Sequence, residues 1–136
     1  MGSRCGGTTG ETMGCYGIRG ATCVAKNDEA AILEATRELL GKMQTENEIS
    51  IERITSVIFT VTSDLNAVYP ARAARDMGWQ QTPFLCTADM DVPGSLPRCV
   101  RVLMHVDIDR PHDEVRHVYL GEARSLRPDW AKEVVT

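Results

Sequence analysis

The segment that most constrains the fold runs from residue 99 to residue 108 and reads CVRVLMHVDI. In an extended backbone, one face of this segment carries only apolar residues, namely Val100, Val102, Met104, Val106 and Ile108. Such alternation predicts a β-strand with one face in a core. The opposite face carries Arg101, which is costly in so apolar a strand unless an anionic group meets it. We therefore expect a sheet that buries one side of this strand and offers an anion to the other.

The flanking patterns predict a mixed sheet with helices on one face, in the α/β or α+β class. Helical spacing covers residues 28–46, with Asn27 or Asp28 as the N-cap, and a shorter helix covers residues 70–79. Gly17 and Gly20 are expected to break the first strand where its backbone approaches another group. The predicted strands lie at residues 15–24, 54–62, within 82–94, at 99–108 and at 116–123.

The length of 136 residues fits one domain, which we place at residues 15–136. Residues 1–14 hold five glycines and no large aliphatic side chain, so we expect a disordered leader. No apolar run approaches the roughly 20 residues that a membrane span needs, which leaves a cytoplasmic location as the default. The net charge of −4 argues against a nucleic-acid or membrane-surface partner.

Motifs for metal or nucleophilic chemistry do not stand out. The five cysteines are odd in number and include no CxxC pair, which argues against a disulfide framework or a structural zinc site. No P-loop, GxSxG or HExxH motif is present. His105, His112 and His117 have no ligand spacing and are interpreted as structural or surface residues. We therefore predict neither a metal site nor a cofactor.

Arginine dominates the basic residues: of fifteen, twelve are arginine. Its planar fork binds carboxylates and phosphates through two hydrogen bonds, so this bias favours a small anionic ligand. Drift toward arginine in a GC-rich genome explains the composition equally well. Taken singly, each arginine other than Arg101 is interpreted as a surface salt-bridge partner.

Six short motifs occur in one order along the chain. They are GIRGAT at 17–22, AVYPARAAR at 67–75, CTADMDVPGSL at 86–96, CVRV at 99–102, RHVYL at 116–120 and LRPD at 126–129. Together they resemble the monofunctional AroH-class chorismate mutases, from about residue 15 to the end. The resemblance implies the Claisen rearrangement of chorismate to prephenate, in phenylalanine and tyrosine biosynthesis, with no cofactor. It also implies a homotrimer, a pseudo-α/β-barrel with active sites in the clefts between subunits.

The resemblance also assigns roles to individual residues. Arg101 matches the catalytic arginine at the ether oxygen of the substrate. Cys86 and Asp89 match positions that meet the ring hydroxyl. Arg19 and Tyr119 match residues that contact the substrate carboxylates. Tyr69, Arg72 and Arg75 match the pocket wall and mouth contributed by a neighbouring subunit. Arg127 lies in the tail that closes over the site. Two of these residues depart from the family pattern, because Asp89 stands where glutamate is common and Arg72 where lysine is frequent.

Two other functions stay open from the residues alone. One is a trimeric imine deaminase of the RidA type, which also has an interfacial arginine. The other is a non-catalytic sensor that binds a carboxylate metabolite. Turnover of chorismate distinguishes the mutase from both.

Overall fold

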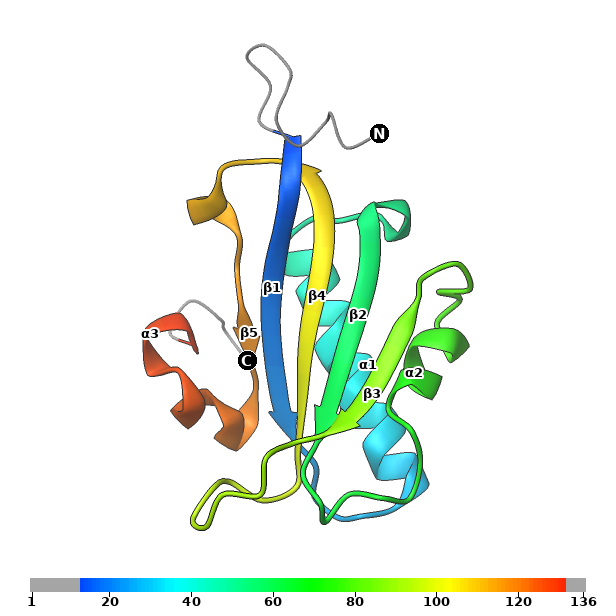
Figure 1. Ribbon diagram of the computed structural model, residues 1–136, viewed down its shortest axis with the longest axis vertical. Coiled ribbons are helices and arrows are strands. Elements are labelled where there is room, and N and C mark those ends of the chain that lie inside the picture. The colour runs from blue at the N-terminus through cyan, green and yellow to red at the C-terminus, as the bar shows by residue number, and fades with distance from the viewer. Residues whose placement is uncertain (1–12, 132–136) are drawn as a thin grey trace.

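The computed structural model describes residues 13–131, which form a five-stranded mixed sheet with helices packed against it (Figure 1). The strands are β1 (Met13–Cys23), β2 (Ile54–Val61), β3 (Phe84–Ala88), β4 (Cys99–Asp109) and β5 (Val118–Tyr119). The α-helices are α1 (Glu29–Glu46), α2 (Ala71–Asp76) and α3 (Pro128–Ala131). Short 3₁₀ helices are η2 (Ile51–Arg53), η3 (His112–Glu114) and η4 (Gly121–Leu126). The mixed α+β fold predicted from the sequence is confirmed.

Strand β4 is the centre of the sheet, whose order is β3-β2-β4-β1-β5. It pairs antiparallel with β1 and β2, while β5 runs parallel to β1 and β3 runs parallel to β2. Arg101 lies opposite Ala21 on one side and Thr60 on the other. Because neighbours in register point to the same face, these three side chains share a face of the sheet.

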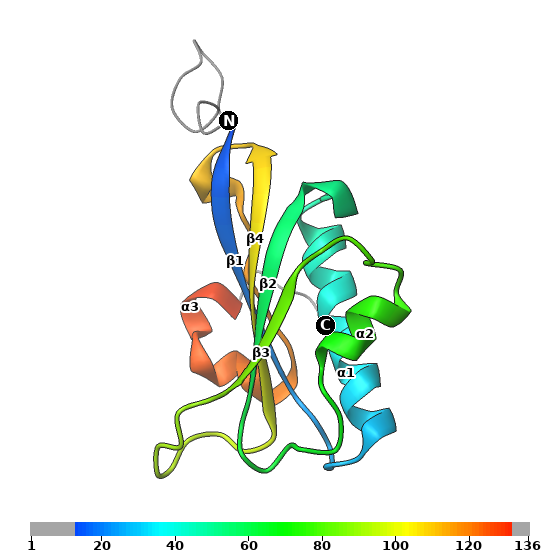
Figure 2. The same ribbon diagram turned by 45° about the vertical axis from the view of Figure 1, so that its right-hand side comes forward.

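The other face of the sheet carries the core, and helices α1 and α2 cover it (Figure 2). The alternation predicted for β4 is confirmed, since all five of its predicted core residues are at most 5% exposed. Leu39, Leu40 and Met43 of α1 and Ala71 and Ala74 of α2 form one cluster with four of them, and Val100 packs in a second cluster with Ile32 of α1. This packing fixes the strand that carries Arg101.

Both helix boundaries follow the expected local chemistry. The Asp28 carboxylate accepts a hydrogen bond from the Ala31 N–H at 2.7 Å, which satisfies a free donor in the first turn of α1. Helix α2 begins directly after Pro70 and ends before Gly78, whose φ of +94° suits glycine. The predicted caps of both helices are therefore confirmed.

Two sequence predictions differ from the structure. Strand β1 starts at Met13, two residues inside the predicted leader, where it pairs with the end of β4; residues 1–12 lie outside the described part of the chain. The strand predicted over 116–123 is wrong except at Val118–Tyr119. Gly121, at a φ of +57°, turns the backbone out of the sheet and into η4. The chain then forms α3.

Gly20 is a close-packing position within an unbroken strand, rather than a break in it. A Cβ atom there would lie 2.5 Å from Sδ of Met43 and 3.2 Å from a methyl carbon of Leu39. Because both neighbours are fully buried, we expect Gly20→Ala to lower the free energy of unfolding by about 1–3 kcal/mol. Denaturant unfolding at a fixed protein concentration measures this change. Gly14→Ala on the same strand is the control, since its Cβ meets only ordinary contacts; equal stability of the two variants would contradict the expectation.

Candidate active site

Three strands bring the first group of predicted site residues together on the face of the sheet opposite α1. Ala21 on β1 lies in register with Arg101 on β4 and with Tyr119 on β5. The row therefore places the predicted catalytic arginine and the predicted tyrosine on either side of one small residue. Arg19 is the next residue along β1 on the same face. The sheet, rather than a loop, fixes this arrangement.

Asp89 is the anionic group that Arg101 meets. The Nε atom of Arg101 lies 3.1 Å from Oδ2 of Asp89. Asp89 follows β3, and its N–H donates a hydrogen bond to the carbonyl of Val61, the last residue of β2. The two side chains are 33% and 17% exposed. Within residues 13–131, neither the buried Nε nor the Nη groups of Arg101 have a hydrogen-bond partner, so the contact with Asp89 is an ion pair. The aspartate thus holds the guanidinium by charge and leaves its fork open to a second anion.

Three arginines lie near the side chain of Tyr119. Its side chain is fully buried, and burial raises the pKa of its phenol, while the positive charges of Arg19, Arg127 and Arg101 oppose that rise. The tyrosine therefore stays neutral at pH 7 and keeps its hydroxyl proton. The electrostatic balance favours a negatively charged ligand.

His117 and Asp129, which the sequence analysis did not assign to the site, contact two of the arginines. The N–H of Arg19 donates to Nδ1 of His117 at 2.9 Å, which ties β1 to the segment before β5. The Arg127 guanidinium forms two contacts with Asp129, at 2.9 and 3.2 Å. The structural interpretation of His117 is thus confirmed. Its position two residues before Tyr119, on the same side of the chain, was the only sequence signal for a place near the site.

The second group of predicted site residues surrounds α2 and β3. Cys86 lies opposite Phe59, a core residue, and is half-buried. Burial raises the pKa of its thiol, while the Ala71 backbone and the charge of Arg75 lower it. Arg72 binds Glu29 of α1 at 2.7 Å, and Tyr69 is 74% exposed.

The two groups lie on opposite faces of the sheet in one chain. Cys86 shares a register row with Phe59 and Val102, which face the helices, whereas Arg101 shares its row with Thr60. Each group alone is an incomplete pocket wall. A single chain therefore does not bring all nine predicted residues together.

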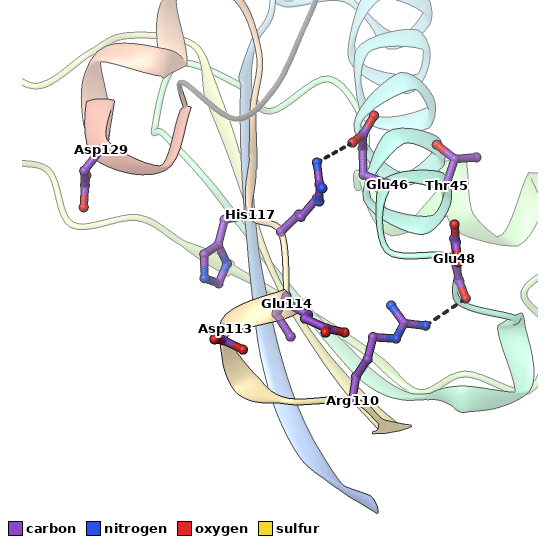
Figure 3. Close-up of a pocket in the computed structure, with 10 residues that line it drawn as sticks. Thr45, Glu46, Glu48, Arg110, Asp113, Glu114, His117 and Asp129 are labelled. Carbon is purple, nitrogen blue, oxygen red and sulfur yellow. Dashed lines mark hydrogen bonds and ion pairs between the residues drawn. The ribbon is translucent and has the colours of Figure 1, made fainter. Parts of the chain in front are cut away.

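A cavity of about 1100 Å³ lies beside the first group, between the end of α1, η3 and α3 (Figure 3). None of the nine predicted residues lines it, although His117 and Asp129 do. Its lining carries five carboxylates against two guanidiniums, Arg110 and Arg116, and both guanidiniums contact groups of the chain itself. A dianionic ligand is unfavourable in such surroundings.

Residues 13–131 hold neither a cluster of metal ligands nor a membrane-spanning helix. No three histidine, cysteine, aspartate or glutamate side chains gather closely enough to hold a metal ion. No helix in this range has the length and apolar character needed to cross a membrane.

Comparison with known proteins assigns the family. Residues 15–130 match the family described as chorismate mutase type I. The chorismate mutase AroH of Bacillus subtilis (strain 168) is 46% identical over 114 residues, which cover 83% of this chain and 90% of that protein. The corresponding enzyme of Thermus thermophilus is 54% identical over 114 residues, with 83% and 93% covered. A solved chorismate mutase from Clostridium thermocellum superposes with a TM-score of 0.80 at 46% identity, over 81% of this chain and 98% of that one. By these matches over most of its length, the chain belongs to the chorismate mutase type I family.

Proposed function

We infer that the chain rearranges chorismate to prephenate as an isomerase of aromatic amino acid biosynthesis. Family membership over residues 15–130 supports this activity, and it leaves the imine deaminase and the sensor without support. The observation that carries the mechanism is the guanidinium of Arg101, which forms an ion pair with Asp89 and has its Nη groups open. The reaction needs such a group, because negative charge grows on the ether oxygen as its C–O bond breaks.

We propose that Arg101 is the catalytic residue and acts by electrostatic stabilisation. The sheet and Asp89 hold the cation before the substrate arrives, so little reorganisation is needed when charge develops. In the same proposal, Arg19 and Tyr119 contact the substrate carboxylates and Arg127 closes the site. Their confinement within one charged region keeps the dicarboxylate in a compact, reactive conformation.

Asp89 stands at a position where glutamate is common in the family. Its side chain is one methylene shorter, and its Oδ2 atom contacts Nε of Arg101 directly at 3.1 Å. We propose that it orients Arg101 and meets the ring hydroxyl of the substrate. The arginine at position 72 keeps the positive charge of the usual lysine, here beside Glu29.

We propose that the active protein is a homotrimer, with each site shared by two subunits. The separation of the two residue groups onto opposite faces supports this assembly, since a neighbour could supply Tyr69, Arg72, Arg75 and Cys86. Strand β3 also lies at the edge of the sheet, and Leu85 on it is 60% exposed. An exposed apolar edge strand favours burial against another chain. Light scattering is expected to give about three times the chain mass of 15.0 kDa.

The activity is tested by following the ultraviolet absorbance of chorismate with purified protein. We expect chorismate to disappear and an isomer of the same mass, prephenate, to accumulate in equal amount. Binding of chorismate without turnover would contradict the proposed function. So would hydrolysis of imines in its place.

The pH dependence of turnover follows from the two neutral groups of the site. Burial raises the pKa of both the Tyr119 phenol and the Cys86 thiol, so both stay protonated through the neutral range. We therefore expect kcat to stay nearly constant from about pH 6 to about pH 8, because neither of these two groups changes charge there and the rearrangement needs no proton transfer. Initial rates in buffers of constant ionic strength measure this. A steep bell-shaped profile would indicate acid–base chemistry instead.

We also propose a cytoplasmic location. The four described cysteines are free thiols, which suits a reducing compartment.

A further inference from the structure

Two thiols meet at the end of the sheet close to Arg101, and no step proposed above uses them. Cys23 is the last residue of β1 and Cys99 is the first residue of β4. The two lie opposite each other in the strand register, and their Sγ atoms are 3.4 Å apart. This is a contact between sulfur atoms with no other atom between them.

The strand register suits a covalent bond between these thiols. The Val24 N–H donates to the Arg98 carbonyl at 2.8 Å, so the pair next to the cysteines is a hydrogen-bonded one. Hydrogen-bonded and non-hydrogen-bonded pairs alternate in an antiparallel ladder, which makes Cys23 and Cys99 a non-hydrogen-bonded pair. The Cα atoms of such pairs lie about 4.5 Å apart, within the range of about 4.4 to 6.8 Å found in disulfides.

The thiol pair lies on the same face of the sheet as the first group of site residues. Cys99 is two residues before Arg101 on β4, and Cys23 is two residues after Ala21 on β1. Cys23 also packs against the buried cluster of Ala21, Tyr119 and Ala123. The pair is therefore part of the support beneath the candidate site.

We propose that Cys23 and Cys99 form an oxidisable dithiol, and that a disulfide between them reversibly lowers the activity of the adjoining site. The oxidant is a small disulfide such as oxidised glutathione. One thiolate attacks its S–S bond and releases one glutathione thiol, leaving a mixed disulfide. The second thiolate then attacks the protein sulfur of that mixed disulfide and releases the other glutathione. The protein loses two protons and two electrons, and the oxidant becomes two thiols.

The surroundings set the order of these two attacks. Cys23 is half-buried and Cys99 is fully buried, so the oxidant reaches Cys23 first. Burial raises the pKa of both thiols, and that of Cys99 reaches about 12. The contact with Cys99 lowers the pKa of Cys23, as expected if the Cys99 thiol donates to the Cys23 thiolate. The thiolate fraction is small at pH 7 and grows as pH rises, so oxidation should be slow at pH 7 and faster in alkali.

Formation of the disulfide would displace Cys23 rather than Cys99. An S–S bond of about 2.0 Å is shorter than the present contact, so one sulfur must approach the other. Thr62 holds the backbone of Cys99. The Cys99 N–H donates to Oγ1 of Thr62 at 3.0 Å, and the Thr62 N–H donates to the Cys99 carbonyl at 3.1 Å. Cys23 therefore moves, and it packs against the buried cluster of Ala21, Tyr119 and Ala123, which Leu126, the residue before Arg127, also contacts. This displacement links the bond to the segment that closes the site.

The test uses the full-length reduced protein, exposed to oxidised glutathione at about pH 7 and about pH 9. Free thiols are then blocked with N-ethylmaleimide, the protein is digested without reduction, and chorismate turnover is measured on the same samples. We expect a linked peptide pair containing Cys23 and Cys99, an intact mass about 2 Da lower, and faster linkage at the higher pH. We expect a several-fold loss of kcat/KM, which dithiothreitol restores. Cys23→Ala should resist both changes, and Cys15→Ala, on the exposed part of β1, should undergo both.

Three results would overturn the proposal. One is a stable glutathione adduct on Cys23 without linkage, because the two sulfurs then cannot close a bond. Another is linkage through a different cysteine. The third is full turnover of chorismate by protein whose Cys23–Cys99 disulfide is intact.

Discussion

Replacement of Arg101 by alanine is expected to lower kcat roughly a hundred to a thousandfold, with a much smaller change in KM. The loss corresponds to ~3–4 kcal/mol for one preorganised donor aimed at developing charge. The effect falls on kcat because the ether oxygen carries its charge mainly in the transition state. Steady-state kinetics with chorismate measure both parameters.

Two control variants separate this role from a structural one. Arg101→Lys keeps the positive charge but loses the planar fork that Asp89 orients, so we expect an intermediate rate. Arg37→Ala, on an exposed position of α1, should leave kcat unchanged. Circular dichroism checks that all three variants fold. A variant Arg101→Ala with a raised KM and normal kcat would show that the arginine only binds substrate.

The sheet and the place of Arg101 in it were predictable from residues alone, whereas the other site residues were assigned only by the family resemblance. The alternation in the segment that became β4 showed which of its side chains enter the core, and it left Arg101 on the opposite face in need of an anion. The structure supplies that anion as Asp89, from the loop between β3 and β4. Periodicity could not identify this partner, because pairing between β2 and β3 brings Asp89 there.

Other features depended on contacts that no local pattern encodes. The segment after residue 117 is apolar enough to be a strand, but the positive φ of Gly121 ends it after two residues. His117 supports Arg19 only because β5 runs beside β1. Cys23 and Cys99 are 76 residues apart and meet only through the register of β1 and β4. In the last two cases tertiary pairing, and not residue preference, decides the outcome.

The division of site residues between two faces leads to the second large expected effect. If each site takes Arg101 from one subunit and Arg75 from its neighbour, two inactive variants can complement each other. Arg101→Ala destroys the first half of every site, and Arg75→Ala weakens the second half. Either protein alone should therefore lose most of its kcat/KM.

Co-refolding Arg101→Ala with Arg75→Ala in equal amounts is expected to restore about a quarter of the wild-type kcat/KM. An intact site needs the first half from an Arg75→Ala subunit and the second from an Arg101→Ala neighbour. Random assembly gives each a chance of one half, and both conditions must hold together. Measurement of kcat/KM across mixing ratios should show a maximum at equal amounts.

The matched control mixes two variants from the same half, Arg101→Ala and Asp89→Ala. No subunit in that mixture carries an intact first half, so activity should not exceed that of the separate proteins. Equal recovery in both mixtures would show that the gain reflects refolding rather than shared sites. Absence of recovery in the first mixture, with mixed assemblies confirmed by mass, would place a complete site within one chain. That result would contradict the inference drawn from the opposite faces of Cys86 and Arg101.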